Sequence, residues 1–235
     1  MIGTLINVAA ILTGGAFGLF FGARLPERLK TTVIAGMGLF VVAIGVQMFL
    51  KTENPLVVLG ALLIGAILGE WWQLEDGLQR LGSWLERKFA NGDGDPSSRF
   101  VRGFLTASLL FCIGPIAILG AIQDGLVGDY KLLVIKSVLD GFASLAFAST
   151  LGIGVLFSSA VILFYQGGIS LLAHQLQSVM TPVMMNEMTA TGGVLLMGVG
   201  CSGLLEIKKI RVGNFLPALA IAPLIVFVVG LFPGT

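Results

Sequence analysis

Two charged side chains lie within an otherwise apolar stretch, LLVIKSVLDGFASL from Leu132, and are the residues best suited to do chemistry. Lys136 and Asp140 are four positions apart, so in a helix they share one face and can form an ion pair. Charges are costly inside a membrane helix and usually face a bundle interior or a watery pathway. We therefore expect Asp140 to be the central functional residue. For Lys136 a second interpretation stays open, in which its ammonium group extends to the outer interface.

A break in the backbone is predicted upstream of this pair, at Gly114 and Pro115 in CIGPIAILG from Cys112. Proline lacks an N–H donor and clashes with the preceding helical turn. A broken helix would leave carbonyl and amide groups that can bind an ion or a polar solute. The alternative is a simple proline kink whose polar groups are satisfied by neighbouring helices.

Neutral polar side chains are a further set of candidates to line a pathway for a polar solute. In the other apolar runs these are Asn7, Gln47, Gln123 and Gln166, and the alternative for each of them is a hydrogen bond that joins two helices. Ser144 adds a polar group along the same helix as Asp140.

Signatures of enzymes and of metal sites are missing from the sequence. It contains no P-loop, HExxH, CxxC or GxSxG motif, and both cysteines sit inside apolar runs. We therefore predict no catalytic residues, no metal and no cofactor. The formal net charge of +1 gives no reason to expect a nucleic-acid partner.

The elements that must position these residues are membrane helices. Hydrophobic residues make up 56% of the chain and charged residues 11%, where a soluble protein carries about a quarter. The apolar residues form runs near the roughly 20 residues that cross a bilayer, without the alternation of a β-barrel. About eight spans are predicted, at 2–22, 32–50, 55–73, 100–122, 132–150, 153–173, 189–206 and 213–232.

One polar segment, residues 74–99, separates the third span from the fourth. Leucines and aromatic residues recur at helical spacing over 74–90, between charged residues. This pattern predicts an amphipathic helix at the membrane interface, followed by an exposed loop at 91–98.

Basic residues are divided unequally between the two sides of this eight-span arrangement. One side receives 11 of the lysines and arginines and the other receives three. Basic loops stay in the cytoplasm, so both termini are predicted to face outward from a multi-pass protein of a bacterial inner membrane.

An internal repeat relates the first three spans to the last three. In the alignment GLFVVAIGVQMFL from Gly38 lies on GVLLMGVGCSGLL from Gly193, so Gly38 matches Gly193 and Gly45 matches Gly200. Five spans precede the second triplet, namely the three of the first triplet and the two between the triplets. Because five is an odd number, the second triplet enters the membrane from the opposite side. The charges of the turns invert in the same way.

The predicted fold is therefore a single integral membrane domain, 1–235, with an all-α 3+2+3 architecture. Repeat one covers 2–73, a central helix pair covers 100–150, and repeat two covers 153–232. Inverted repeats of this kind are the architecture of many secondary transporters.

Three stretches carry a resemblance to a known family. They are GTLINVAAILTGGAFG from Gly3, CIGPIAILGAIQDGLVGDYKLLVIKSVLDG from Cys112 and TGGVLLMGVG from Thr191. With them, the chain resembles the YdfK/YqgA-like family of bacterial inner-membrane proteins over nearly its whole length. The function of that family is unknown, so the resemblance implies location and fold and assigns no site residues.

We expect a secondary transporter or channel for a small solute or ion, and not an enzyme. The alternative is a non-transporting membrane scaffold or regulatory protein. Its expected partners are membrane lipid, the small solute or ion and, as a further option, copies of itself. A watery cavity beside Asp140 favours transport, whereas dry packing of these residues favours the scaffold.

Overall fold

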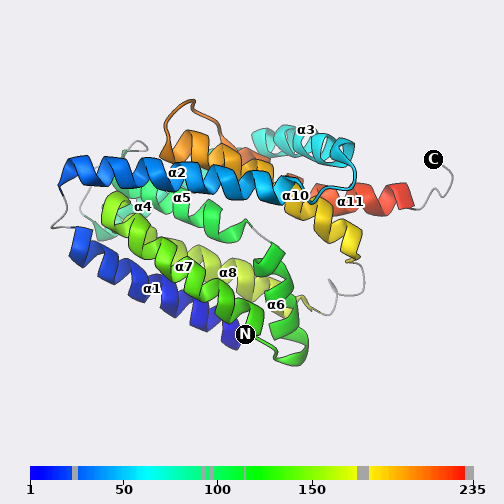
Figure 1. Cartoon of the computed structure of the whole chain (residues 1–235), viewed down its shortest axis with the longest axis horizontal. Coiled ribbons are helices and arrows are strands. Elements are labelled where there is room, and N and C mark those ends of the chain that lie inside the picture. The colour runs from blue at the N-terminus through cyan, green and yellow to red at the C-terminus, as the bar shows by residue number, and fades with distance from the viewer. Residues whose placement is uncertain (23–25, 91–93, 96–97, 114, 174–179, 231–235) are drawn as a thin grey trace. The chain divides into compact units, whose positions relative to one another are not determined.

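The computed structural model describes residues 1–22, 26–90, 94–95, 98–113, 115–173 and 180–230, and these residues contain helices and no strands (Figure 1). Its helices are α1 (Ile2–Gly22), α2 (Glu27–Phe49), α3 (Pro55–Trp72), α4 (Leu74–Phe89), α5 (Arg99–Cys112), α6 (Pro115–Val127), α7 (Lys131–Leu151), α8 (Gly154–Leu171), α10 (Pro182–Val199) and α11 (Ala218–Gly230). A π-helical turn, η1 (Gly200–Leu204), continues α10, and a 3₁₀ turn, η2 (Val212–Phe215), precedes α11.

The helices group into two compact units. Unit 1 comprises residues 1–37 and 78–178, and unit 2 comprises 38–77 and 179–235. Unit 1 therefore contains α1 and α5 to α8, whereas unit 2 contains α3, α10, α11 and most of α2.

Six of the described helices are long and apolar enough to cross a membrane, and the number is seven if one bent pair of helices counts as a single span. The six are Ile2–Gly22, Glu27–Phe49, Pro55–Trp72, Lys131–Leu151, Gly154–Leu171 and Val212–Gly230. A multi-pass α-helical membrane protein is thus the fold class, and the count of eight spans stays a prediction.

The span expected at 100–122 is interrupted. α5 ends at Cys112, α6 begins at Pro115, and the two helices are bent by 64° relative to each other. Pro115 opens α6, which is where a residue without an N–H donor is tolerated in a helix. A broken helix, rather than one continuous span with a mild kink, is what the chain forms here.

The span expected at 189–206 begins earlier than predicted. α10 starts at Pro182, with Thr181 as its N-cap, and the Thr181 hydroxyl accepts a hydrogen bond from Met184 N at 3.3 Å. A threonine followed by proline at the first helical position is a strong start signal. The consequence is that Glu187, which the prediction left in a loop, lies inside a helix.

In unit 1, α1 packs closely along α7 (Figure 1). Gly14 and Gly18 are four apart, and a Cβ on either would collide with the backbone oxygen of Gly141 or Leu145. Small residues at this spacing let two membrane helices approach backbone to backbone. Because the contacts advance together along both helices, α1 and α7 are parallel.

The third long helix of unit 1, α8, runs opposite to α1. A Cβ on Gly15 would meet Leu156 at the start of α8, and a Cβ on Gly167 near its end would meet Met1. Towards its own end, α8 also contacts α6, where Ser170 Oγ donates to the Ala121 carbonyl at 2.9 Å. The interior of unit 1 thus lies between α1, α7, α8 and the α5–α6 pair.

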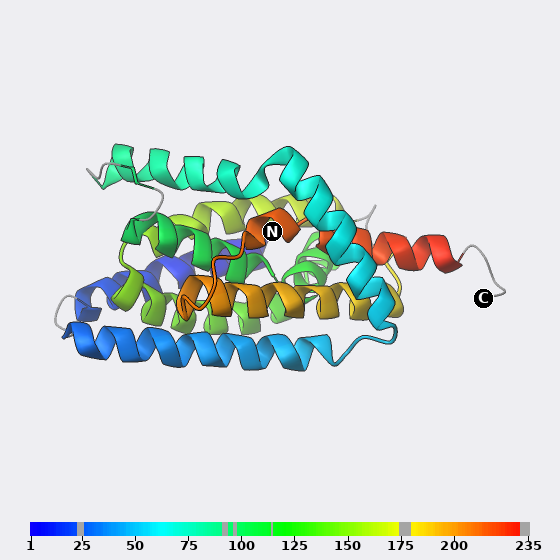
Figure 2. The same cartoon turned by 90° about the horizontal axis from the view of Figure 1, so that it is seen from above.

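In unit 2, α2 and α10 cross antiparallel, and Figure 2 shows them alongside each other. A Cβ on Gly45 would lie 2.6 Å from the Gly193 oxygen, and one on Gly193 would lie 2.5 Å from the Gly45 oxygen. A Cβ on Gly200 would lie 3.0 Å from the Gly38 oxygen. The four glycines aligned in the sequence repeat therefore form the contact between these helices.

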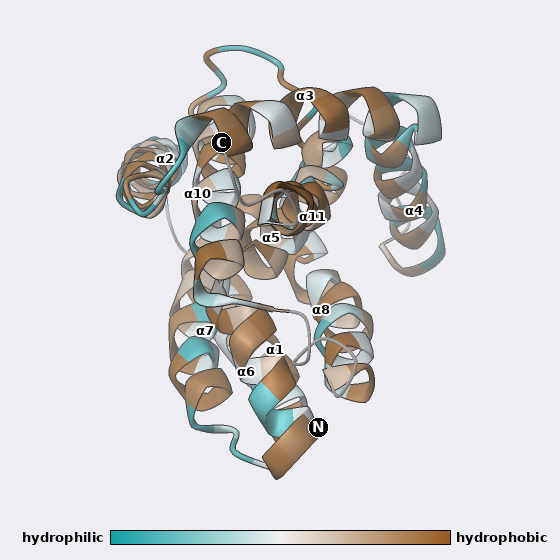
Figure 3. Cartoon of the chain, turned by 90° about the vertical axis from the view of Figure 1, so that its right-hand side faces the viewer, coloured by the Kyte–Doolittle hydropathy of each residue, from teal (hydrophilic) through white to brown (hydrophobic). Residues whose placement is uncertain are grey.

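The helices α3 and α11 are the second antiparallel pair of unit 2. A Cβ on Gly65 would lie 2.6 Å from Ala218 N, whereas Gly60, one turn earlier in α3, faces Ile225, which lies later in α11. Around this contact Ala61, Ala218 and Ala222 form a fully buried core. Their exposed faces are apolar, as the hydropathy colouring of Figure 3 shows for α3 and α11.

The amphipathic helix expected at 74–90 is present as α4. Glu75 and Asp76 lie in its first turn and Arg87 and Lys88 in its last, which suits the helix dipole. In unit 1, its Phe89 ring packs 5.4 Å from the Phe157 ring of α8, measured between centroids. The apolar face of α4 is therefore anchored on α8.

Candidate functional site

The candidate site is a cluster of four polar side chains in unit 1, contributed by α1, α7 and α8. Its centre is the ion pair of Lys136 and Asp140 on α7, in which Lys136 Nζ donates to Asp140 Oδ2. The two residues are 6% and 7% exposed. The predicted pairing is therefore formed, and the alternative in which Lys136 extends away to the interface does not describe this structure.

Two amide side chains complete the cluster. Asn7 Nδ2 donates to Asp140 Oδ2 at 3.0 Å and to Gln166 Oε1 at 3.3 Å. Asn7 and Gln166 are both fully buried. The opposite orientation of the Asn7 amide would set its oxygen against a carboxylate, so the neighbours fix which atom is the donor.

Two atoms of these amides lack partners. Asn7 Oδ1 and Gln166 Nε2 make no hydrogen bond with any described residue. Buried polar groups are normally hydrogen-bonded, and each unsatisfied one requires an explanation. The cluster thus offers one acceptor and one donor to something that the chain itself does not supply.

The cluster lies beside the break between α5 and α6. Lys136 Nζ is 5.9 Å from the centroid of the Phe111 ring, in the last turn of α5. An ammonium group at this distance over an aromatic face is favourably placed. Of the predicted break, Pro115 begins α6 and Gly114 lies outside the described residues.

The other sequence candidates do not join this cluster. Ser144 is buried one turn further along α7, where its hydroxyl donates to the Ile11 carbonyl of α1 at 2.8 Å. Ser144 therefore joins α7 to α1. Gln123 is half-buried in α6, and Gln47 is exposed on the part of α2 that belongs to unit 2.

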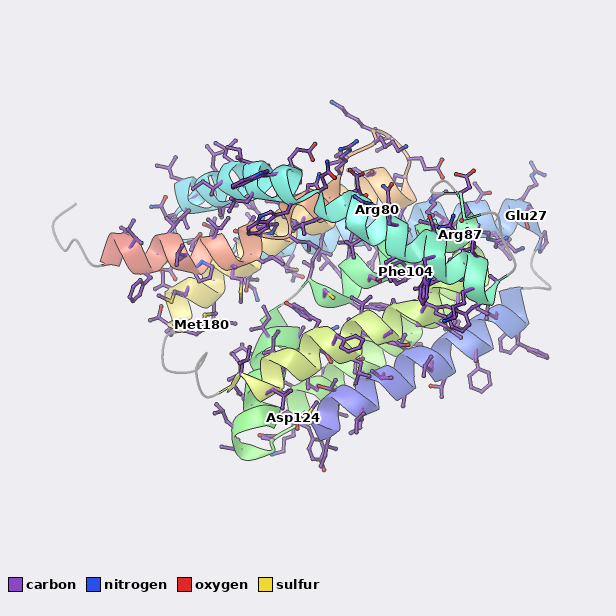
Figure 4. The ribbon with its side chains drawn as sticks, turned by 180° about the vertical axis from the view of Figure 1, so that it is seen from behind. Glu27, Arg80, Arg87, Phe104, Asp124 and Met180 are labelled. Carbon is purple, nitrogen blue, oxygen red and sulfur yellow. The ribbon has the colours of Figure 1, made fainter. Side chains whose placement is uncertain are left out.

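A second buried carboxylate of unit 1 lies on α6. Asp124 is 3% exposed, and its Oδ2 accepts a hydrogen bond from Gly3 N at 3.0 Å. Figure 4 shows it on α6, near the start of α1. Because α6 extends to Val127, Asp124 lies inside a helix and not in the turn that follows it.

Sequence reasoning missed the buried carboxylate of unit 2. Glu187 on α10 is 1% exposed and accepts from Thr52 Oγ1 at 2.7 Å, Glu53 N at 2.7 Å and Asn54 N at 3.0 Å. These donors form the turn between α2 and α3. The Thr181-Pro182 start signal would have placed Glu187 in a membrane helix and marked it as a candidate.

The chemistry available to the cluster is that of a charge pair with exchangeable partners. Asp140 shares its charge with a flexible ammonium and a neutral amide, so a proton or small cation can replace either. No group of three or more His, Cys, Asp or Glu side chains suited to a metal ion occurs among the described residues.

Two proteins similar to this chain are described as uncharacterised. It is 34% identical to the "Uncharacterized membrane protein YdfK" of Bacillus subtilis (strain 168), with 99% of this chain and 98% of that protein covered. It is also 34% identical to the "Uncharacterized protein YqgA" of Escherichia coli (strain K12), with 94% of each covered. The resemblance noted from the sequence is thereby confirmed.

The search of solved structures gives no match. At the level of families, residues 2–227 match the one described as "Protein of unknown function (DUF554)". That match covers nearly the whole chain. The chain therefore belongs to the DUF554 family.

Proposed function

We propose that the chain is a secondary transporter or channel for a small solute or ion. In this proposal Asp140 binds a proton or a small cation in competition with the ammonium group of Lys136. The observation that carries it is the buried ion pair with Asn7 Oδ1 and Gln166 Nε2 unpaired beside it. Ionisable groups at membrane depth usually mark ion or proton pathways.

The exchange follows from the geometry. Asp140 Oδ2 accepts from both Lys136 and Asn7, so a cation on this carboxylate must displace at least one of them. Lys136 has a long flexible stem and three donors, which makes it the partner that can move. Its release would change the charge beside the α5–α6 break, where the backbone is already interrupted.

The proposed architecture is an inverted repeat of α1, α2 and α3 with α8, α10 and α11. Three pairs of equivalent helices, α1 with α8, α2 with α10 and α3 with α11, contact each other and run antiparallel, as an inversion requires. In the sequence alignment Gly38 corresponds to Gly193, and Gly200 corresponds to Gly45. The contact between Gly38 and Gly200 is therefore equivalent to the contact between Gly193 and Gly45. This reciprocity supports a two-fold relation between the two triplets. The contacting parts of each pair lie within one unit, α1 with α8 in unit 1 and the other two pairs in unit 2.

Helix directions also support the eight-span topology. α1 is parallel to α7 and antiparallel to α8. The eight-span topology requires these directions, because its first and fifth spans run from the outside to the cytoplasm and its sixth span runs back to the outside. A re-entrant α5–α6 pair would reverse α7 relative to α1. We therefore propose a bacterial inner-membrane location with both termini outside.

A non-transporting scaffold is the second candidate. One observation favours it, namely that all four cluster residues are closed off from solvent in this structure. In a scaffold the same hydrogen bonds would serve to hold α1, α7 and α8 together. A transporter in its occluded state would show the same closure, so the two functions differ in what happens when the charge is removed.

The test uses purified protein in vesicles that enclose a pH-sensitive dye. A proton gradient is imposed, and lithium, sodium or potassium chloride is added outside while the internal pH is recorded. Transport predicts a flux above that of protein-free vesicles, lost in Asp140→Asn and retained in Asp129→Asn, the matched control in the connection between α6 and α7. Equal flux for protein-bearing and empty vesicles under every condition argues for the scaffold.

A further inference from the structure

A small cavity lies in unit 1, away from the polar cluster and with no part in the proposed transport. It has a volume of about 230 Å³. Its lining comes from the end of α1, the start of α2, the start of α5 and the end of α7. The lining residues are Leu19, Gly22, Lys30, Arg99, Ala148, Ser149 and Gly152.

Two of these residues are basic, and none of the described lining residues is acidic. Lys30 is 9% exposed, and its ammonium donates to Glu27 Oε1 at 2.6 Å. The Glu27 side chain is 79% exposed, and Figure 4 shows it at the end of α2 where the helix begins. A lysine held inside with its counter-ion in solvent leaves two ammonium donors for another acceptor.

Arg99 is fixed in place by the end of α7. Its Nε donates to the Thr150 carbonyl at 2.7 Å, where the helix dipole favours a cation. Among the described residues this is the one hydrogen bond of the guanidinium group. The two terminal nitrogens, which form the fork that recognises phosphate and carboxylate, therefore make no hydrogen bond there, and the Glu27 carboxylate acts on Arg99 only through its charge.

The rest of the lining is apolar or small. Leu19, Gly22 and Ala148 contribute no charge, and next to them Phe20 and Phe21 at the end of α1 are 58% and 53% exposed. A soluble ligand gains nothing from such an exposed apolar border in water, whereas a lipid tail does. The volume is below the roughly 300–1,000 Å³ that enclose a whole ligand, so it suits a headgroup whose remainder lies outside.

We propose that this cavity binds the phosphate group of an anionic phospholipid, with Arg99 and Lys30 as its ligands and the acyl chains against α1. Basic pockets between membrane helices on the cytoplasmic side hold anionic headgroups in this way. The proposed topology puts these helix ends on that side. The inference does not depend on whether the chain transports anything.

The test is native mass spectrometry of the detergent-purified chain with equal amounts of dioleoyl phosphatidylglycerol and dioleoyl phosphatidylcholine. The two lipids share their acyl chains and differ in net charge. We expect preferential phosphatidylglycerol adducts in the wild type, reduced roughly tenfold or more in Lys30→Gln/Arg99→Gln. Arg28→Gln, an exposed arginine on the same helix, should retain the preference.

Several results would overturn this proposal. Equal retention of the two lipids by the wild type would do so without any variant, and so would an unchanged preference in the double variant. A phosphate-dependent thermal shift in the wild type without preference for phosphatidylglycerol would assign the cavity to a free anion instead. Arg99→Lys keeps the charge and should bind with intermediate strength, which covers the case in which the double variant does not fold.

Discussion

Asp140 in unit 1 and Glu187 in unit 2 are both buried carboxylates on membrane helices, yet their partners differ in kind. Asp140 is held by side chains, the Lys136 ammonium and the Asn7 amide. Glu187 is held mainly by backbone N–H groups, those of Glu53 and Asn54, with the Thr52 hydroxyl as a third donor. Side chains can rotate away, whereas backbone groups of a turn cannot.

This difference separates a carboxylate suited to exchange from one suited to fixing a fold. The surroundings of Glu187 contain three donors within 3.0 Å. Beside Asp140 two amide atoms remain unpaired. Burial alone therefore does not identify a functional carboxylate, and the mobility of its partners is the better guide.

The largest expected effect is on flux. Asp140→Asn keeps the shape and should reduce cation-dependent proton flux in vesicles to the level of empty ones, because an amide cannot bind a cation as a carboxylate does. Glu187→Gln should retain the wild-type proton flux when the flux is divided by the amount of folded protein. Loss of flux in both variants, or in neither, would remove the contrast between the two carboxylates.

The next effect is on stability and concerns Glu187. Glu187→Met removes the acceptor of two backbone N–H groups, those of Glu53 and Asn54, and leaving them unsatisfied costs about 1–3 kcal/mol per group. The measurement is thermal unfolding in detergent, with Glu53→Met as the control, since Glu53 is exposed and accepts from Asn186 Nδ2 alone among the described contacts. Equal melting temperatures for the two variants would contradict the fixing role.

A third variant reverses the expected sign of the stability change. Replacing both charges, Lys136→Met/Asp140→Leu, should leave the melting temperature unchanged or raise it by the equivalent of about 1–4 kcal/mol, because desolvating a buried pair is costly. The same variant should have no flux. A large loss of stability would instead show that the ion pair is needed for folding and would favour the scaffold.

The smallest effect concerns Gln166. Gln166→Leu removes one acceptor from Asn7 and the unpaired Nε2 together, and hydrogen bonds between membrane helices average about 0.6 kcal/mol. We expect a marginal shift in melting temperature and a measurable change in the cation concentration at half-maximal flux. If neither quantity moves, the amides are not part of the site.

Much of this site was accessible from the sequence because its central contact is local. The spacing of Lys136 and Asp140 predicts their pairing without any knowledge of the fold. Asn7 could be named as a polar residue in a span, but its partner is 133 positions away, and one-sequence patterns do not specify distant contacts. Gln166 could also be named as a polar residue in a span, but the sequence does not indicate its contact with Asn7.

Helix positions were predictable where apolar runs ended in strong signals. α3 begins at Pro55 after its N-cap Asn54, and the predicted span began at the same residue. The start of α10 carries an equally good signal in Thr181 and Pro182, but the polar residues after it made the segment look like a loop. Misplacing that start by seven residues was enough to miss Glu187.

The glycine contacts were predictable only in part. The spacing of Gly14 and Gly18 indicates a close helix neighbour but not that α7 is the neighbour. The sequence alignment matched Gly38 with Gly193 and Gly45 with Gly200, whereas in the structure Gly45 lies against Gly193 and Gly200 lies near Gly38. The alignment therefore named the glycines that take part in the contact but not which of them touch.

The parallel packing of α1 on α7 has a consequence for the order of events during biosynthesis. Asn7 enters the membrane with α1, but its acceptor on Asp140 is made 133 residues later. At about 5–20 residues per second, the ribosome takes about 7–27 s to cover that distance. For that period the glycine face and the buried amide of α1 must be sheltered by lipid headgroups, by water or by the insertion machinery, and the first helix of the chain reaches its final neighbours only after the fifth predicted span has been made.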